Sequence, residues 1–190
     1  MTSTTRLLRV QATRGRVLDA ATELFLRNGL HATTTDMVAQ RAGLSRGTVQ
    51  RLYPRKRMLA AEVTERLCRR AIDRMHQRQP RDIDDLIVML TSWAHLIVSR
   101  PRWITLYIEL RFIDDACLSA VFHRRARLRE SLSELLDKVD ACDPSRSEAT
   151  AEFLLTIILG MALQHAHGAG PDLADIRSHI RLVVGGAGTR

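Results

Sequence analysis

The stretch TTDMVAQRAGLSRGTVQRLYPRK, at positions 34–56, constrains the fold of this chain more than any other part of its sequence. Thr34 is suited to an N-cap, because its hydroxyl can accept a backbone N–H of the first helical turn. Val38 and Ala42 then fall on one face of a short helix by their spacing. Gly43 follows where that helix must end, and glycine tolerates the left-handed conformation of a tight turn. This half of the stretch therefore predicts a short helix and a turn.

The second half of the stretch predicts another short helix. Ser45 can cap it, and Val49 and Leu52 form its buried face. Pro54 ends it, because proline lacks a backbone N–H and disfavours helix in the residue before it. Two short helices joined by a tight glycine-containing turn form a helix-turn-helix, a unit that places its second helix in the DNA major groove.

The exposed positions of this second helix carry side chains suited to reading DNA. Glutamine pairs with adenine and arginine with guanine through two hydrogen bonds, and threonine meets a phosphate or a thymine methyl. The residues at these positions are Arg46, Thr48, Gln50 and Arg51. An ordinary helical hairpin with a polar outer face has the same spacing, so spacing alone leaves both interpretations open.

A set of residues in register resembles the N-terminal domain of TetR-type transcriptional regulators, over about residues 12–63. The matching residues are Ala20, Ala21, Leu24, Phe25, Gly29, Ala32, Thr33, Thr34, Ala39, Ala42, Gly43, Leu44, Ser45, Gly47, Thr48, Tyr53 and Lys56. The chain departs from the family pattern where Gln50 replaces Tyr, Leu52 replaces His and Arg57 replaces an acidic residue. The family's Tyr commonly contacts a phosphate, and we interpret Gln50 as a base-reading residue instead.

The resemblance implies an all-α fold with two domains. An N-terminal arm and helix-turn-helix DNA-binding domain would occupy residues 1–55. A helical effector-binding and dimerisation domain would occupy residues 56–190, with the helix that starts at residue 56 as connector. It also implies a sequence-specific transcriptional regulator, in the family's habit a repressor, bound to double-stranded operator DNA.

Within that implied domain we expect two kinds of DNA contact. Arg46, Gln50 and Arg51 are expected to read bases, and hydroxyl and lysine groups to contact phosphates. The phosphate candidates are Thr33, Thr34, Thr48, Tyr53 and Lys56. The full expected set is Thr33, Thr34, Thr35, Ser45, Arg46, Gly47, Thr48, Gln50, Arg51, Tyr53 and Lys56.

The charge distribution agrees with this assignment. Residues 1–60 contain eleven Arg and Lys residues and three Asp and Glu residues, whereas the rest of the chain contains eighteen of each. A basic segment on a neutral body is typical of a nucleic-acid module attached to another domain. A basic solvated surface alone would not explain why basic and acidic residues are equal in number in the rest of the chain.

The rest of the composition indicates a cytoplasmic protein. Cys68, Cys117 and Cys142 are odd in number and far apart, which argues against a disulfide framework and for a reducing compartment. No segment approaches the ~18 consecutive apolar residues of a membrane span. The first residues lack the apolar core and cleavage site of a secretory signal. We therefore expect no membrane association.

Helical periodicity continues through the chain, and no strand pattern is present. Residues 1–13 are expected to form a mobile basic arm. The expected helices are 15–28, 34–42, 45–52, 56–77, 82–98 with Asp82 as N-cap, 103–112, 115–139, 147–167 and 173–184.

The helix expected at 147–167 is apolar on nearly every side, which predicts burial on every side. This all-round apolarity suggests a second surface to bury, that of a partner subunit, and the resemblance places the homodimer interface on the last two helices. Gly160 would let a facing helix approach, or serve as a packing notch within one subunit. A two-fold dimer sets its reading helices roughly 34 Å apart, which predicts a palindromic operator.

The resemblance also implies a small-molecule effector, of unknown identity, between the helices of the second domain. Aromatic and polar residues are the candidates for its pocket wall, although each is individually more typical of core or surface. They are Trp93, Trp103, Tyr107, Phe112, Phe122 and His123.

Catalytic and metal-binding functions find little support in the sequence. No nucleophile motif, phosphate loop or catalytic carboxylate pair is present, so we expect no enzyme and no cofactor. His165 and His167 form the only tight histidine pair, but alternate helical residues diverge, so we expect no metal site. Two alternatives stay open: an architectural DNA-binding protein without effector, and a helical ligand-binding or interaction protein whose basic segment is incidental.

Overall fold

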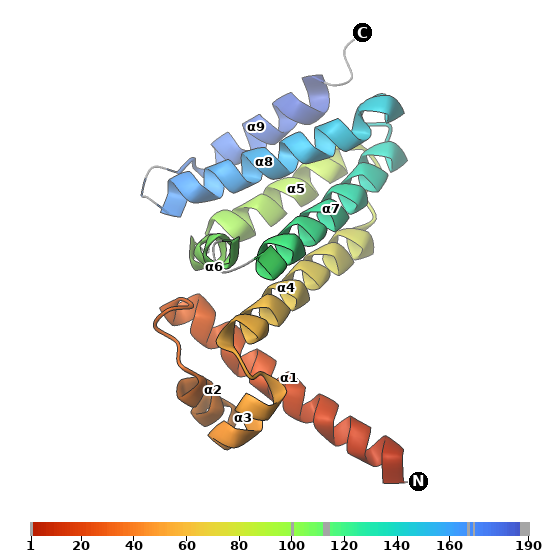
Figure 1. The fold of residues 1–190 in the computed structure, drawn as a ribbon. Coiled ribbons are helices and arrows are strands. Elements are labelled where there is room, and N and C mark those ends of the chain that lie inside the picture. The colour runs from red at the N-terminus through yellow and green to blue at the C-terminus, as the bar shows by residue number, and fades with distance from the viewer. Residues whose placement is uncertain (1, 100, 112–114, 167, 169, 187–190) are drawn as a thin grey trace. The chain divides into compact units, whose positions relative to one another are not determined.

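The computed structural model describes residues 2–99, 101–111, 115–166, 168 and 170–186. These residues form α-helices and one short 3-10 turn, with no strand among them (Figure 1), so the expected all-α fold is confirmed. The helices are α1 (Thr2–Asn28), α2 (Thr35–Ala42), α3 (Arg46–Leu52), α4 (Lys56–Arg78), α5 (Ile83–Val98), α6 (Pro101–Arg111), α7 (Asp115–Lys138), η1 (Pro144–Arg146), α8 (Ser147–Ala166) and α9 (Leu173–Gly186).

The chain divides into two compact units. The first comprises residues 1–67 and 105–120, and the second comprises residues 68–104 and 121–190. Helix α4 therefore supplies its first half to one unit and its second half to the other. The functional boundary expected after residue 55 stays a prediction.

The first unit is built around helix α1, which packs on α2, while α2 packs on α3. Val17, Ala21 and Phe25 of α1 are fully buried, as the helical spacing predicts. Helix α1 ends where expected, because Gly29 adopts a left-handed φ of +86°. The backbone N–H of Gly29 donates to the carbonyl oxygen of Phe25 at 2.9 Å, which closes the last turn.

The mobile arm expected at residues 1–13 is wrong, because α1 begins at Thr2. No proline or glycine interrupts residues 2–14, and extending a formed helix adds one hydrogen bond per residue without a new nucleation cost. Residues 5–12 of this extension are exposed, including Leu7, Leu8 and Val10. Its helicity therefore comes from continuity with the packed part of α1.

In the second unit, α5 packs against both α8 and α9, which also pack on each other. Leu86 and Leu90 of α5, Leu154 of α8 and Ile180 of α9 are fully buried there. Asp82 caps α5 as expected, since its Oδ1 accepts the N–H of Asp85 at 2.8 Å.

Helix α8 is buried on one side, with Leu154, Ile158 and Ala162 inside. Phe153 is 57% exposed and Gly160 is exposed, so burial on all sides is not reached within one chain. The segment Pro144–Ala166 is long and apolar enough, by composition alone, to cross a membrane. A core helix has the same composition, so this is weak evidence for a membrane span.

Candidate nucleic-acid interface

The helix-turn-helix forms with the capping residues that its sequence predicts. The Thr34 hydroxyl accepts the N–H of Met37 at 3.2 Å at the start of α2. The Ser45 hydroxyl accepts the N–H of Thr48 at 3.2 Å at the start of α3. Helix α3 closes at Tyr53, whose backbone N–H donates to Val49 at 2.8 Å. The turn and both helix starts are thus fixed by local hydrogen bonds.

The turn between the two helices depends on glycine. Gly43 has a φ of +63°, and the N–H of Leu44 then reaches the carbonyl oxygen of Ala39 at 2.9 Å. Arg16 of α1 donates through Nη2 to the carbonyl oxygens of Ala42 at 2.6 Å and Gly43 at 3.0 Å. This cation satisfies carbonyls left open at the end of α2. The sequence did not predict it, because Arg16 lies on another helix.

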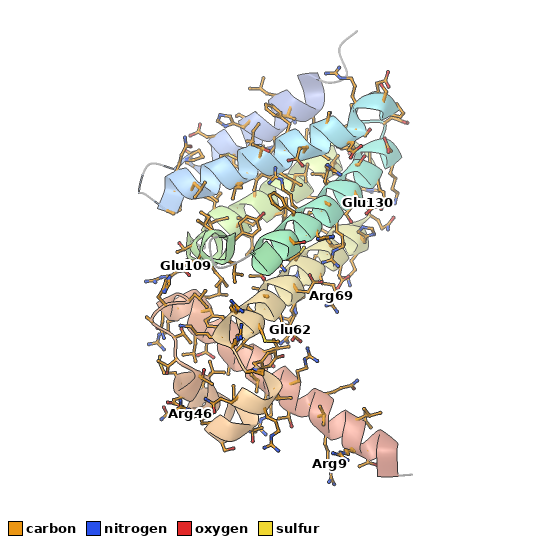
Figure 2. All side chains as sticks on the ribbon, in the orientation of Figure 1. Arg9, Arg46, Glu62, Arg69, Glu109 and Glu130 are labelled. Carbon is orange, nitrogen blue, oxygen red and sulfur yellow. The ribbon has the colours of Figure 1, made fainter. Side chains whose placement is uncertain are left out.

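The outer face of α3 is exposed, as its pattern predicts. Arg46, Gln50 and Arg51 are exposed, whereas Val49 is fully buried. The side chains of Gln50 and Arg51 form no hydrogen bond with another described residue. We call Arg46, Gln50 and Arg51 the reading face; Figure 2 marks Arg46 on its helix. The hydrogen-bonding groups of these two side chains therefore face solvent and have no partner within the described chain.

Arg46 differs from its neighbours on this face, because it has an ionic contact. Its Nη1 lies 3.1 Å from Oδ2 of Asp36, in the first turn of α2. Both side chains are more than half exposed, at 63% and 58%. Asp36 was not among the residues predicted to contribute to the site.

Thr33 and Lys56, both predicted to contact phosphate, hold the loop between α1 and α2. Thr33 is fully buried, and its hydroxyl donates to the carbonyl oxygen of Gly29 at 2.8 Å. The Lys56 ammonium donates to the carbonyl oxygens of Leu30, His31 and Thr33 at 2.7, 3.2 and 2.9 Å. An ammonium has three N–H donors, so all are engaged. Phosphate contact by Lys56 stays a prediction and would require it to give up one of these bonds.

Tyr53, another predicted phosphate contact, is 5% exposed and lies under a guanidinium. Arg14 Nε donates to the Tyr53 hydroxyl at 3.1 Å and to Glu62 at 2.7 Å, and Arg14 Nη2 reaches Glu62 at 2.5 Å. The guanidinium carbon lies 5.7 Å from the Tyr53 ring centroid. The hydrogen bond to Glu62 raises the pKa of Arg14, and burial raises the pKa of Tyr53 to about 12. Tyr53 is therefore neutral at physiological pH.

We call Thr33, Tyr53 and Lys56 the anchor, because the bonds of all three join backbone and helices within the first unit. The remaining predicted residues lie near the helix starts. Thr34, Ser45 and Gly47 are exposed, while Thr35 and Thr48 are half-buried. The structure thus divides the predicted set into an accessible group and a committed group.

The predicted effector residues whose side chains the structure describes lie on α5, α6 and α7, and their role stays a prediction. Trp93 is half-buried on α5, and Phe122 and His123 are exposed on α7. Tyr107 is half-buried and belongs to the first unit. Phe112 and the side chain of Trp103 lie outside the described residues.

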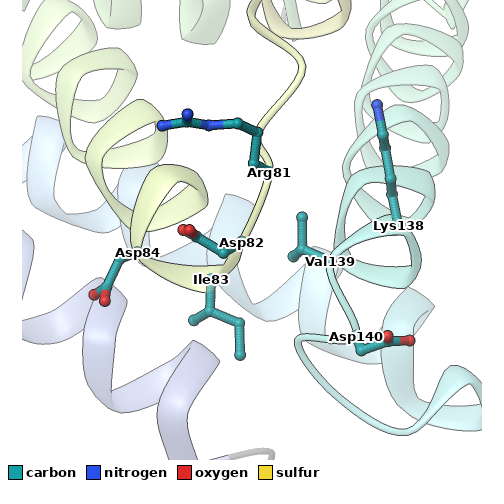
Figure 3. A pocket seen from close by; sticks show the side chains of 7 residues that line it. All are labelled: Arg81, Asp82, Ile83, Asp84, Lys138, Val139 and Asp140. Carbon is teal, nitrogen blue, oxygen red and sulfur yellow. The ribbon is translucent and has the colours of Figure 1, made fainter.

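One pocket in the second unit has a volume of about 420 Å³ and contains none of these aromatic residues (Figure 3). It lies where the segment before α5 meets the end of α7. Charged side chains dominate its wall, and apolar contacts are few. Its lining residues are Arg81, Asp82, Ile83, Asp84, Lys138, Val139 and Asp140. Among the described side chains, no group of three His, Cys, Asp or Glu residues could hold a metal ion.

Comparison with known proteins agrees with this geometry. Residues 17–63 match the model of the bacterial regulatory proteins of the tetR family. No curated protein matches the chain. Among solved structures, a TetR-family protein from Mesorhizobium loti superposes with a TM-score of 0.78 at 18% identity, covering 94% of this chain and 96% of the other.

Two further solved structures cover nearly the whole chain. Thermus thermophilus FadR, a TetR-family repressor in complex with lauroyl-CoA, has a TM-score of 0.68 at 24% identity, covering 93% of this chain and 96% of its own. The fatty acid degradation regulator FadR from Bacillus halodurans has a TM-score of 0.70 at 15% identity, covering 93% and 99%. Residues 17–63 therefore match the model of the tetR family of regulatory proteins, and the chain as a whole shares the all-helical fold of TetR-family regulators.

Proposed function

We propose that the protein binds operator DNA sequence-specifically through the reading face of α3 and represses transcription. The observation that carries this proposal is the exposed Gln50 and Arg51 on a helix whose start, turn and end are fixed by hydrogen bonds. Such a helix can present side chains to base edges without first ordering its backbone. A protein that occupies an operator blocks polymerase sterically.

The two groups of predicted contacts have different roles in this proposal. The reading face supplies base contacts, and the exposed residues Thr34, Ser45 and Gly47 lie at helix starts, where N–H groups favour phosphate. The anchor holds the backbone next to these positions through its hydrogen bonds. Thr33 and Lys56 hold the loop before α2, and Tyr53 fixes the end of α3.

We propose a homodimer formed through α8 and α9, which would read a palindromic operator. Support comes from the apolar residues that one chain leaves uncovered on these helices: Phe153 is 57% exposed and Leu182 is 72% exposed. Burying such side chains stabilises association by about 25 cal/mol per Å² of apolar area before the costs of binding are subtracted. A two-fold arrangement places the two α3 helices roughly one DNA turn apart.

We propose that a small molecule releases the repressor by binding the second unit and preferring the DNA-free state. The related FadR from Thermus thermophilus was solved with lauroyl-CoA, which supports ligand binding by this fold. The chemical class of the effector stays open. It also stays open which of the six predicted residues line its pocket: Trp93, Trp103, Tyr107, Phe112, Phe122 and His123. We propose no catalytic role, and a cytoplasmic location.

The extension of α1 favours a second candidate, an architectural protein that binds DNA without an effector. Arg6 and Arg9 are exposed on it, and no acidic residue precedes Asp19. Cations on a projecting helix attract phosphate irrespective of sequence. This alternative predicts weak sequence preference.

Selection of bound duplexes from a random DNA pool, at about 150 mM salt, separates the two candidates. The repressor proposal predicts a two-fold symmetric consensus. Failure to enrich any sequence would contradict it and favour the architectural alternative.

A further inference from the structure

Asp36 is an acidic residue on a surface proposed to face a polyanion. It is one of three Asp and Glu residues among the first 60 residues. The other two, Asp19 and Glu23, lie on α1 and bond to Arg66 and Arg41, each at 2.6 Å. Asp36 instead bonds to Arg46, a member of the reading face, at 3.1 Å. Its position therefore concerns DNA recognition directly.

Folding stability gives little reason for an acidic residue at this position. Exposed ion pairs contribute little, because solvent and salt screen them and two long side chains lose rotamer freedom. A carboxylate in the first turn of α2 does favour the helix dipole, but asparagine or serine is accommodated at such a position as well. Against DNA, the same carboxylate repels phosphate. A benefit in recognition would offset that cost.

We propose that Asp36 is a positioning residue that holds the Arg46 guanidinium for one base pair and keeps it away from phosphates. The contact uses Nη1, one edge of a rigid planar group with five N–H donors. Fixing that edge orients the remaining donors before binding, which reduces the entropy lost when Arg46 pairs with guanine.

The same ion pair lowers sequence-independent binding. A guanidinium already next to a carboxylate gains less from a phosphate, whereas the two-bond contact with guanine depends on geometry as well as charge. Asp36 thereby raises the ratio of specific to non-specific affinity. The inference rests on the proposed DNA-reading function of α3.

The test measures binding of the full-length protein to its selected consensus duplex and to duplexes with every single base-pair change. Wild type, Asp36→Asn, Arg46→Ala and the double variant are compared by fluorescence anisotropy. We expect Asp36→Asn to reduce discrimination about five- to tenfold at one base pair, the position that Arg46→Ala also affects. Non-specific affinity should rise about two- to fivefold, because one negative charge is lost.

Two controls distinguish positioning from charge alone. Glu23→Gln removes the same charge from an exposed ion pair elsewhere in the first unit, and it should shift all duplexes alike, by less than about twofold. In the Arg46→Ala background, Asp36→Asn should not change discrimination further, because the two residues act as one unit. Thermal melts should be unchanged for both single charge variants.

Unchanged discrimination by Asp36→Asn at every base pair would overturn the inference while leaving the proposed function intact, provided that wild type selects a consensus. A loss at positions that Arg46→Ala does not affect would overturn it as well. If wild type selects no consensus, the proposed function fails, and this inference fails with it.

Discussion

The reading face and the anchor lie in one small domain and contain similar chemical groups, but their surroundings differ. On the reading face, the side chains of Gln50 and Arg51 are exposed and form no hydrogen bond with other described residues. In the anchor, Lys56 binds three carbonyl oxygens and Thr33 is fully buried. A cation or hydroxyl is available to DNA only when the fold leaves its donors uncommitted. Residue type therefore identifies candidates for DNA contact. The hydrogen-bonding environment separates the side chains that stay accessible from those engaged within the fold.

Replacing Lys56 should have the largest effect, because it leaves three carbonyl oxygens without their donor. We expect Lys56→Met to lower the free energy of unfolding by about 2–4 kcal/mol, since bonds to a charged group are strong. Chemical denaturation measures this change. Arg55→Met, at an exposed neighbour, should change stability by less than about 0.5 kcal/mol.

DNA titrations across salt concentrations test the alternative for Lys56. A direct phosphate contact predicts unchanged stability and a salt slope smaller by about one unit. That result would place Lys56 among the DNA-contacting residues, and the hydrogen bonds of the anchor would then not exclude DNA contact.

Replacing Gln50 should affect recognition and leave folding unchanged. We expect Gln50→Ala to cost about 1–3 kcal/mol of discrimination at one base position, because a two-bond contact with adenine is lost. Competition binding with single-substituted duplexes measures it, and the melting temperature should not move. Equal weakening against all sequences would contradict a base-reading role.

The two glycines of the helix-turn-helix make a matched pair. Gly43→Ala should destabilise the protein by about 1–2 kcal/mol, because φ is +63° and the new Cβ would lie 3.0 Å from Arg16 Nη2. Gly47→Ala meets no atom within 4 Å and lies inside α3, so it should stabilise the protein by about 0.5–1 kcal/mol. Thermal denaturation compares them. If Gly47→Ala stabilises the fold but weakens DNA binding, α3 approaches DNA closely at that residue.

A further expected effect, outside the physiological pH range, is a pH dependence in the anchor. Burial raises the pKa of Tyr53 to about 12 in the folded protein, from about 10 when unfolded. The folded state then binds more protons than the unfolded state between about pH 10 and 12, so stability should fall as pH rises through this range. Chemical denaturation of wild type and Tyr53→Phe between about pH 10 and 12 isolates the contribution of Tyr53 to the free energy of unfolding. The same pH dependence in both proteins would exclude that contribution.

Local sequence predicted the parts of the site that depend on local hydrogen bonds. Thr34, Gly43 and Ser45 cap or turn the chain as expected, because a cap and the N–H it accepts lie within one helical turn. The roles of Arg16 and Asp36 could not be predicted in this way. Each binds a residue on another helix, and that proximity arises only from packing.

The error in the predicted fold concerns the start of α1. Residues 5–12 are exposed, as in a solvated arm, yet they belong to helix α1. The apolarity of α8 is a different case: it predicts burial on all sides with a partner subunit, one chain covers only one side, and the rest stays a prediction. Periodicity and capping residues identified every α-helix among the described residues, but they could not identify which helices pack together.

The most direct test of the central claim is duplex selection by the triple variant Arg46→Ala, Gln50→Ala, Arg51→Ala beside wild type. These exposed side chains contribute little to folding, so the melting temperatures should agree within about 2 °C. If α3 reads the sequence through its outer face, wild type will enrich a two-fold symmetric consensus and the variant will enrich none, while retaining weak salt-sensitive binding. Enrichment of the same consensus by the folded triple variant would contradict the claim and place sequence recognition elsewhere in the protein.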